Sequence, residues 1–222
     1  MRIRRVSPEE AGWGSTNVGP WMRHERRVAY ENAWVTVYHD DVTRPDGEAG
    51  IYGVVHFANT AVGVVAIDDQ DRVALIGQHR YPHDEMSWEI PEGGSPLDED
   101  SLEGAKRELL EETGLVARSW REIGRYQLSN SVTDEAAVTY LATELEQGPA
   151  QPEGSEQLTF RWLPFTTVME MVRSGEISDA LSVLPLQAIA LDRARARSTT
   201  GSHVEVRTPP LHRADEDRPR RA

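Results

Sequence analysis

The sequence contains no cysteine, so disulfide bonds and cysteine-ligated zinc sites are excluded. Lysine is almost as scarce, because Lys106 is the only one in 222 residues and arginine supplies the other basic side chains. No apolar run approaches the roughly 18 residues that a membrane-spanning helix needs. The basic start of the chain is not followed by the apolar stretch of a signal peptide. We therefore expect a cytoplasmic protein with no membrane partner.

The chain also lacks an excess of basic residues, since its formal net charge is -13 and its pI is near 5.0. A nucleic-acid partner would call for a basic face, so we expect no nucleic acid to bind. The acidity does not exclude a small phosphorylated substrate, because bound cations reverse the local field.

Three glutamates, Glu108, Glu111 and Glu112, crowd one turn of a helix predicted over residues 100–113. At about 100° per residue, the three carboxylates fall within an arc of about 100°. Like charges this close destabilise a helix, and a hard divalent cation such as Mg²⁺ or Mn²⁺ relieves the repulsion. Two interpretations are open: a solvated acidic face, or a metal site for chemistry on a phosphate.

The spacing of neighbouring residues favours the metal site. Nine residues of the segment 93–115 share this spacing: Gly93, Glu99, Arg107, Glu108, Leu109, Glu111, Glu112, Gly114 and Leu115. They occupy every fixed position of the Nudix box, so the segment resembles the catalytic motif of Nudix hydrolases. The resemblance implies an α/β Nudix fold, a mixed β-sheet sandwiched between α-helices. It also implies hydrolysis of a nucleoside diphosphate linked to another moiety.

The box is also consistent with a helix on physical grounds. Residues 98–101 offer N-cap side chains, and Gly114 stands where a left-handed C-terminal residue is wanted. Arg107 can pair with Glu103 and Glu111 at a spacing of four residues. An apolar stripe beside the glutamates would seat the helix on a core: Leu102, Ala105 and Leu109.

Four segments are expected along the chain: a flexible N-terminal tail (1–20), a small antiparallel β subdomain (21–58), the Nudix domain (59–195) and a flexible C-terminal tail (196–222). The β subdomain is too small to bury both of its faces, because an isolated small sheet is marginally stable. We therefore expect it to pack against a partner subunit in a homodimer.

Apolar alternation predicts strands over residues 27–42, with a turn at Glu31–Asn32, and over residues 51–57. In the Nudix domain it predicts a hairpin that joins residues 62–67 to residues 73–77. Further strands are predicted near 88–90, 122–127, 136–143 and 160–163. Two helices follow, over 166–173 and 178–195, and Pro185 interrupts the second unless that helix starts near Ser182.

Three features outside the box resemble the ADP-ribose and nucleotide-sugar pyrophosphatase branch of the family. They are the N-terminal β appendage, residues 78–82 (QHRYP) with 88–94 (WEIPEGG), and residues 130–135 (NSVTDE). Two departures broaden the expected substrate range: Asn130-Ser131 replaces a Pro-Gly pair, and Glu92 replaces an alanine. ADP-ribose ranks slightly first, with other nucleotide sugars such as GDP-mannose close behind.

The resemblance implies a role for each box residue. Mg²⁺ or Mn²⁺ is expected on Glu108, Glu111, Glu112 and the backbone carbonyl of Gly93, and Arg107 is expected to orient the glutamates. Glu99 is expected to support the loop, with metal binding as the alternative. Either Glu108 or the loop residue Glu135 would act as the general base. Two alternatives are open for Glu135, a metal ligand or a solvated loop acid beside Asp134.

Substrate contacts are expected from residues outside the box. Arg80 can clamp a phosphate through two guanidinium nitrogens, and Glu89 can contact the base. Trp34, Trp88 and Tyr81 can stack on a purine, although aromatic side chains more often belong to the core.

Other readings of the Nudix resemblance are less consistent with the sequence. A nucleoside triphosphate pyrophosphohydrolase is the nearest alternative, although such enzymes often lack an N-terminal sheet. An isopentenyl diphosphate isomerase relies on a cysteine, which is absent. A transcription regulator that senses ADP-ribose would need a DNA-binding domain, which the irregular C-terminal tail is not expected to supply, and the acidic charge opposes DNA. A catalytically inactive binding module is disfavoured because every box glutamate is present.

Overall fold

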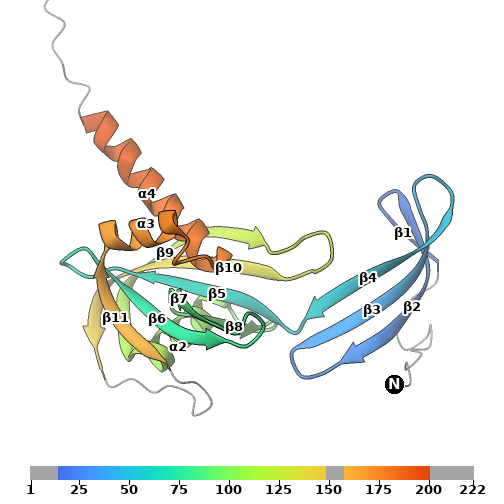
Figure 1. The fold of residues 1–222 in the computed structure, drawn as a ribbon, viewed down its shortest axis with the longest axis horizontal. Coiled ribbons are helices and arrows are strands. Elements are labelled where there is room, and N and C mark those ends of the chain that lie inside the picture. Colours follow the sequence, from blue (N-terminus) through green and yellow to red (C-terminus); the bar gives the residue numbers. More distant parts are fainter. Residues whose placement is uncertain (1–14, 149–157, 201–222) are drawn as a thin grey trace, which may run out of the picture. The chain divides into compact units, whose positions relative to one another are not determined.

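The computed structural model describes residues 15–148 and 158–200 of the chain (Figure 1). The chain divides into two units, residues 1–189 and residues 190–222, and of the second unit only the end of one helix is described. The tails expected at residues 1–20 and 196–222 therefore lie mostly outside the described residues. Their described parts are ordered secondary structure, because a strand occupies Thr16–Val18 and a helix continues to Thr200.

The N-terminal sheet is antiparallel, with the strand order β1-β2-β3-β4. Its strands are β1 (Thr16–Val18), β2 (Trp21–Glu31), β3 (Val35–Thr43) and β4 (Ala49–Phe57). The turn predicted at Glu31–Asn32 is confirmed, since the Asn32 side chain accepts the N–H groups of Trp34 and Val35 at 2.8 Å each. Of the residues in these four strands, only Asp40 and Val42 are buried.

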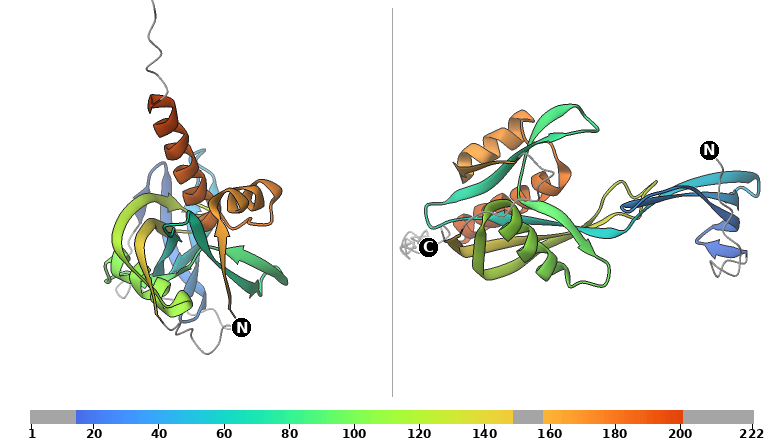
Figure 2. Two further views of the ribbon diagram at one scale, coloured as in Figure 1. Left: turned by 90° about the vertical axis from the view of Figure 1, so that its left-hand side faces the viewer. Right: turned by 90° about the horizontal axis from the view of Figure 1, so that it is seen from below.

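Seven further strands form two sheets (Figures 1 and 2). The larger has the order β8-β5-β10-β9 and is mixed, because β5 and β10 run parallel while the other pairs are antiparallel. Its strands are β5 (Asn59–Ala66), β8 (Glu92–Pro96), β9 (Leu115–Gln127) and β10 (Ala136–Gln147). The smaller has the order β11-β6-β7, with β6 (Arg72–Arg80), β7 (Glu85–Glu89) and β11 (Thr159–Pro164).

The predicted hairpin of residues 62–67 with residues 73–77 is wrong. The two segments belong to β5 and β6, which lie in different sheets and share only an isolated bridge between Ile67 and Val73. Both edges of β5 are already paired, one with β8 and the other with β10. The turn at residues 68–71 therefore redirects the chain from one sheet to the next.

Helices cover both faces of the larger sheet, as expected for the fold class. The helix α2 (Ser101–Thr113) packs Ala105 and Leu109 into the same buried cluster as Val62 and Val64 of β5. On the opposite face of β5, a Cβ at Gly63 would come within 3.2 Å of Leu181, near the start of helix α4 (Ala180–Thr200). The remaining helix is α3 (Phe165–Ser174), which ends at Gly175 in the left-handed conformation.

Helix α4 begins before Ser182, so Pro185 lies inside the helix rather than in its first turn. The Asp179 side chain accepts the N–H of Ser182 at 2.7 Å and caps the helix start. The hydroxyl of Ser182 in turn accepts the N–H of Ile90 at 3.0 Å. The start of α4 is thus tied to the segment that leads into the box.

Candidate active site

Helix α2 presents the box glutamates as predicted. Asp100 caps its start by accepting the N–H of Leu102 at 2.8 Å, and Gly114 ends it with a φ of 70°. Leu109 is fully buried, and the turns around it carry Glu108 and Glu112 toward strand β8. The backbone N–H of Glu92 on β8 donates to Glu112 Oε2 at 3.1 Å, which fixes this carboxylate.

Arg107 braces the helix against β8. Its Nη1 donates to Glu108 at 2.8 Å and to Glu111 at 3.1 Å, while its Nη2 donates to the Gly94 carbonyl at 2.8 Å. The pairing expected with Glu103 is wrong, because Glu103 binds Lys106 at 2.7 Å instead. Arg107 therefore offsets the repulsion between two glutamates and joins them to the neighbouring strand.

The paired glycines of the box allow β8 to approach α2 closely. A Cβ added at Gly93 would lie 2.2 Å from the Glu108 carboxyl carbon, which is far inside van der Waals contact. A Cβ at Gly94 would lie 2.7 Å from the amide nitrogen of Asn59. Only glycine therefore leaves room for the Glu108 carboxylate beside the backbone.

Glu99 lies in the segment between β8 and α2, and it does not line the cavity of the other box glutamates. Its carboxylate accepts the Ser95 hydroxyl at 3.0 Å and lies 3.6 Å from Arg107. This position is the one expected of a residue that supports the box loop.

Arg80 is held by two carboxylates. Its Nε and Nη2 donate to Glu89, and Nη2 also donates to Glu92 at 2.6 Å. Glu89 is only 2% exposed and also accepts from Gln78 at 3.2 Å. Within the described chain, these contacts engage one side of the guanidinium and leave Nη1 as the nitrogen available for a phosphate. Glu89 therefore contacts Arg80 and Gln78 and does not line the cavity that holds the box glutamates.

Several of these carboxylates have raised pKa values. Burial raises the pKa of Glu92, and the charges of Asp179 and Glu89 raise it further, against the opposing effect of Arg80. Burial also raises the pKa of Glu108, which the charge and hydrogen bonds of Arg107 offset in part. Raised carboxyl pKa values gathered in one place are typical of functional sites.

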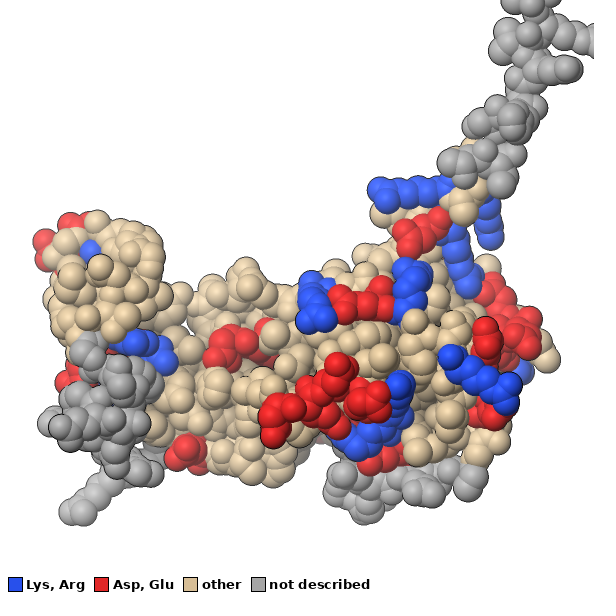
Figure 3. Space-filling model, turned by 180° about the vertical axis from the view of Figure 1, so that it is seen from behind, with Lys and Arg blue, Asp and Glu red and all other residues tan. Residues whose placement is uncertain are grey.

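A cavity of about 560 Å³ brings the predicted residues together. Its volume lies within the usual range for small-molecule sites. It is lined by residues of the N-terminal sheet region and of the Nudix domain: Trp34, Phe57, Asn59, Ala61, Arg80, Glu92, Gly93, Gly94, Arg107, Glu108, Glu111, Glu112 and Glu135. Figure 3 shows one face of the molecule, on which acidic and basic side chains lie close together.

Glu135 reaches this cavity from the loop between β9 and β10. Its side chain is half-buried, and burial raises its pKa, with a further contribution from the charge of Asp179. Within residues 15–148 and 158–200, the Glu135 carboxylate has no hydrogen-bond or ion-pair partner. Because Glu135 lines the same cavity as the box glutamates, the presence of Asn130-Ser131 in place of Pro-Gly has not turned the loop away from the box.

The three aromatic candidates differ in position. Trp34 is 69% exposed at the turn after β2, and it lines the cavity instead of joining the core. Tyr81 is 93% exposed and lies outside the cavity wall. Trp88 packs against Gly77 and beneath the guanidinium of Arg161, 4.6 Å from its ring centre, so it is a packing residue. Only Trp34 is placed to stack on a bound base.

Sequence reasoning missed three parts of the site. Phe57 and Asn59 belong to the end of β4 and the start of β5, where no motif marks them. Asp179 acts on both Glu92 and Glu135 through its charge. It stands at the start of the helix predicted over residues 178–195, and nothing local indicated proximity to the box.

The donor set fits a hard divalent cation, because three carboxylates and the backbone of Gly93 line one cavity. In the part of the chain that the structure describes, no three acidic or histidine side chains are gathered tightly enough to hold an ion as they stand. Arg107 binds Glu108 and Glu111, so a cation would share their oxygens with it. No helix among the described residues is long and apolar enough to cross a membrane.

Comparisons with known proteins agree with this geometry. The NUDIX domain matches residues 58–187, and the nucleoside diphosphate sugar hydrolase N-terminal domain matches residues 20–55. A CMP-5'-(N-acetyl-N-hydroxy-3-aminopropyl)phosphonate hydrolase of Streptomyces rubellomurinus is 31% identical over 76% of this chain and 82% of its own length. An ADP-ribose pyrophosphatase of Mycobacterium tuberculosis is 31% identical over 68% of this chain and 73% of its own length.

A solved structure of an ADP compounds hydrolase has the same fold. Its TM-score is 0.72 at 19% identity, and the match covers 82% of this chain and 98% of that one. The resemblance read from the box and the two matched domains thus agree, and the chain belongs to the Nudix hydrolase family, with the N-terminal domain of nucleoside diphosphate sugar hydrolases.

Proposed function

We propose that this Nudix hydrolase cleaves the pyrophosphate bond of ADP-ribose or a related nucleoside diphosphate sugar. The products would be a nucleoside monophosphate and a sugar phosphate, and the reaction would require Mg²⁺ or Mn²⁺. One observation carries the proposal: a single cavity joins the box glutamates to Trp34, Arg80 and Glu135. The cavity therefore offers the ring of Trp34 for a base, the guanidinium of Arg80 for a phosphate, and carboxylates for metal binding and proton transfer.

The metal would be held by Glu108, Glu111, Glu112 and the Gly93 carbonyl. A bound divalent cation supplies charge neutralisation to the phosphate oxygens and lowers the pKa of water. Arg107 keeps Glu108 and Glu111 in place through its three hydrogen bonds to them and to β8. Arg80, held by Glu89 and Glu92, directs its remaining nitrogen at a phosphate.

Glu135 is the proposed general base. Its carboxylate faces the cavity without a partner among the described residues, whereas Glu108 is already bonded to Arg107. A base must be able to accept a proton from water in its reach, and a carboxylate tied to arginine is a poorer acceptor. Trp34 supplies a face on which a purine can stack.

The assembly would be a cytoplasmic homodimer formed through the N-terminal sheet. Only two residues of that sheet's strands are buried, and several of its large apolar side chains are exposed: Val18, Met22, Tyr30 and Ile51. A second subunit would cover this surface. The β subdomain of residues 21–58 is thus a dimerisation element, joined to a Nudix domain of residues 59–195.

A substrate panel tests the proposal. Phosphate release is measured with a coupled phosphatase on ADP-ribose, GDP-mannose, other nucleotide sugars, ATP and 8-oxo-dGTP, with Mg²⁺ and with excess EDTA. We expect the nucleotide sugars to be cleaved fastest and EDTA to abolish activity. Comparable rates on the triphosphates would assign a triphosphate pyrophosphohydrolase instead, and full activity in EDTA would overturn the metal requirement.

A further inference from the structure

The loop that carries Glu135 is attached to the N-terminal sheet by its backbone. The Val55 N–H of β4 donates to the Val132 carbonyl at 2.8 Å, and the Asp134 N–H donates to the Val55 carbonyl at 3.2 Å. These two bonds form a short parallel bridge between Val55 and Thr133. The loop therefore adds to the end of β4 as a further strand would.

Asp134 completes the attachment with its side chain. Its Oδ1 accepts the Phe57 N–H at 3.1 Å, and its Oδ2 accepts from His56 Nδ1 at 2.6 Å. With its own N–H bound to Val55, every polar group of this residue except its carbonyl contacts the last three residues of β4. Asp134 is therefore the main polar anchor between the loop and the sheet.

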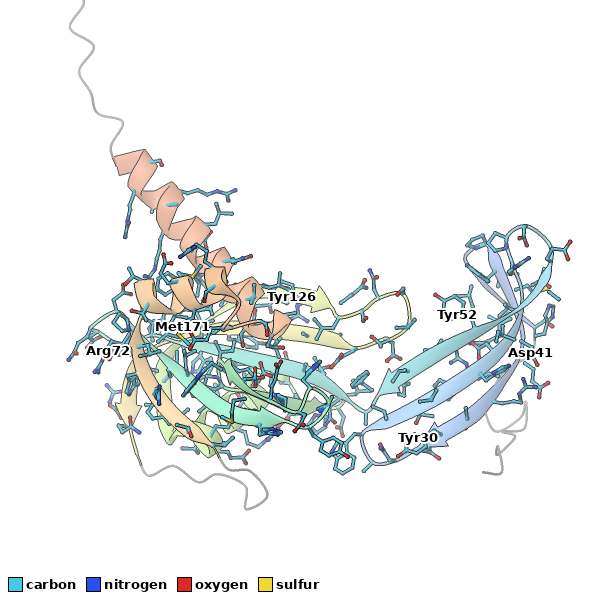
Figure 4. The ribbon with its side chains drawn as sticks, in the orientation of Figure 1. Tyr30, Asp41, Tyr52, Arg72, Tyr126 and Met171 are labelled. Carbon is cyan, nitrogen blue, oxygen red and sulfur yellow. The ribbon has the colours of Figure 1, made fainter. Side chains whose placement is uncertain are left out.

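Tyr52 makes a second and more distant attachment. Its hydroxyl donates to the Ser131 carbonyl at 2.6 Å, and Figure 4 shows Tyr52 on β4. The rest of the loop closes on itself, because Thr133 Oγ1 donates to the Leu128 carbonyl and Leu128 N–H donates to the Glu135 carbonyl at 3.0 Å. The loop is thus a compact unit whose position is set from outside by β4.

The position of the Glu135 carboxylate depends on the attachment of the loop to β4. Its carboxylate has no hydrogen-bond or ion-pair partner among the described residues, so no side-chain contact fixes it. Its backbone is fixed on one side by Asp134 and on the other by the start of β10 at Ala136. Phe57, which donates to Asp134, also lines the cavity that Glu135 faces.

We propose that Asp134 is a positioning residue, which docks the loop of residues 128–135 on β4 so that the N-terminal sheet holds Glu135 over the box glutamates. Asp134 itself does not line the cavity, so it does not act on the substrate directly. The inference rests on the proposed role of Glu135 and adds a function for the N-terminal sheet inside the same subunit. A reacting group displaced by about 1 Å can lose about 100-fold in rate, so the anchor has a measurable effect.

A double-mutant cycle tests the proposal. kcat and KM are measured for the wild type, Asp134→Ala, Glu135→Gln and the double variant, on whichever phosphoric anhydride the wild type cleaves fastest. We expect Asp134→Ala to lower kcat about 10- to 100-fold with KM changed less than about threefold. The double variant should be no slower than Glu135→Gln alone, because residues that act through one another are not additive.

Two variants serve as matched comparisons. Asp134→Asn keeps an oxygen for the Phe57 N–H and an amide for His56, so it should restore most of the lost kcat. Asp46→Ala removes an aspartate in the turn between β3 and β4, where it bonds Arg44 and the Glu48 N–H. This turn precedes the start of β4, whereas the loop contacts the end of β4, so the variant should leave kcat unchanged. Hydrogen exchange of the peptide 128–135 should be faster in Asp134→Ala and unchanged in Asp46→Ala.

Several results would overturn the inference. They are a wild-type kcat or unchanged loop exchange in Asp134→Ala, a double variant that loses the product of the two single losses, or a wild-type kcat in Glu135→Gln. Failure of the proposed substrate is a separate result, because the cycle uses the anhydride that the wild type actually cleaves.

Discussion

Arg107 shows how a helix tolerates three carboxylates on one turn. Its guanidinium binds Glu108 and Glu111 directly, and Glu112 instead accepts the N–H of Glu92 from the next strand. An arginine and a backbone N–H therefore offset the repulsion between the three carboxylates in the absence of a metal ion. These groups hold the three carboxylates at one cavity, and a cation would have to draw their oxygens closer together, because in the described residues they are not yet gathered tightly enough to hold an ion.

Replacing a ligand without changing its shape should separate metal binding from folding. We expect Glu111→Gln and Glu112→Gln to lower kcat at least about 100-fold, since even outer partners of metal ligands are worth about 10- to 100-fold. The amide retains the size of the carboxylate, so the melting temperature without metal should change little. Glu103→Gln is the control, because Glu103 lies on the same helix and its carboxylate binds Lys106 and does not line the cavity. A rate for Glu112→Gln near that of Glu103→Gln would remove Glu112 from the metal site.

The pH dependence of kcat should identify the base. Burial and the charge of Asp179 raise the pKa of Glu135, so its carboxylate becomes protonated at a higher pH than that of an ordinary glutamate. A base must be ionised, and kcat should therefore fall as the pH drops through this raised pKa. Asp179→Asn keeps a helix cap and removes the charge, so it should move the acidic limb to lower pH.

The same profile distinguishes the two candidate bases. Glu135→Gln should lower kcat about 10²- to 10⁴-fold and abolish the acidic limb. The pKa of Glu108 is raised as well, so a limb that persists in Glu135→Gln would assign the base to Glu108. In that case Glu108→Gln should abolish the limb.

The sequence predicted the box part of the site together with Trp34, Arg80 and Glu135, but it did not predict the remaining wall residues. The glutamates and Arg107 lie within one helical turn or two of each other, so their spacing alone places them on one face. Phe57, Asn59 and Asp179 come from segments distant in the sequence, and the tertiary fold brings them to the box. No local pattern encodes such a meeting.

Among the helices and strands too, the features set by neighbouring residues were predicted correctly, and those set by residues distant in the sequence were not. Helix α2 was predicted over residues 100–113 and runs from Ser101 to Thr113, because its caps at Asp100 and Gly114 are local. The hairpin of residues 62–67 with residues 73–77 was wrong because strand pairing depends on which edges remain open. Both edges of β5 are taken by strands that come later in the chain.

The close approach of β8 to α2 predicts the effect of adding a side chain at Gly93. Gly93→Ala should lower kcat about 100-fold or more, because its Cβ would lie 2.2 Å from the Glu108 carboxyl carbon and must displace that ligand. Gly53→Ala on β4 is the control, since a Cβ there meets nothing within 4 Å. Crystal structures or methyl-labelled NMR spectra would show whether the helix itself has moved. Equal rates for the two variants would mean that Glu108 does not need its present place.

At the scale of the whole molecule, the N-terminal sheet has too little core to stand alone. Its four strands bury only Asp40 and Val42, and the buried Asp40 is paired with Arg26 at 2.6 Å rather than packed among apolar groups. The Nudix domain by contrast has a continuous buried cluster between α2 and the mixed sheet. The stability of the sheet must therefore come from further burial, for which a second subunit is the proposed source.

Sedimentation velocity tests the homodimer at micromolar concentration. We expect a single species of twice the 24.9 kDa chain mass, with an interface in the usual range of about 1,200–2,000 Å² or more. Ile51→Glu should weaken the dimer, because Ile51 is 67% exposed on β4 and a buried charge would oppose association. Val116→Glu makes the same kind of change on β9, outside the N-terminal sheet, and should leave the dimer intact. A monomeric wild type would refute the dimer, and equal weakening by both variants would place the interface elsewhere.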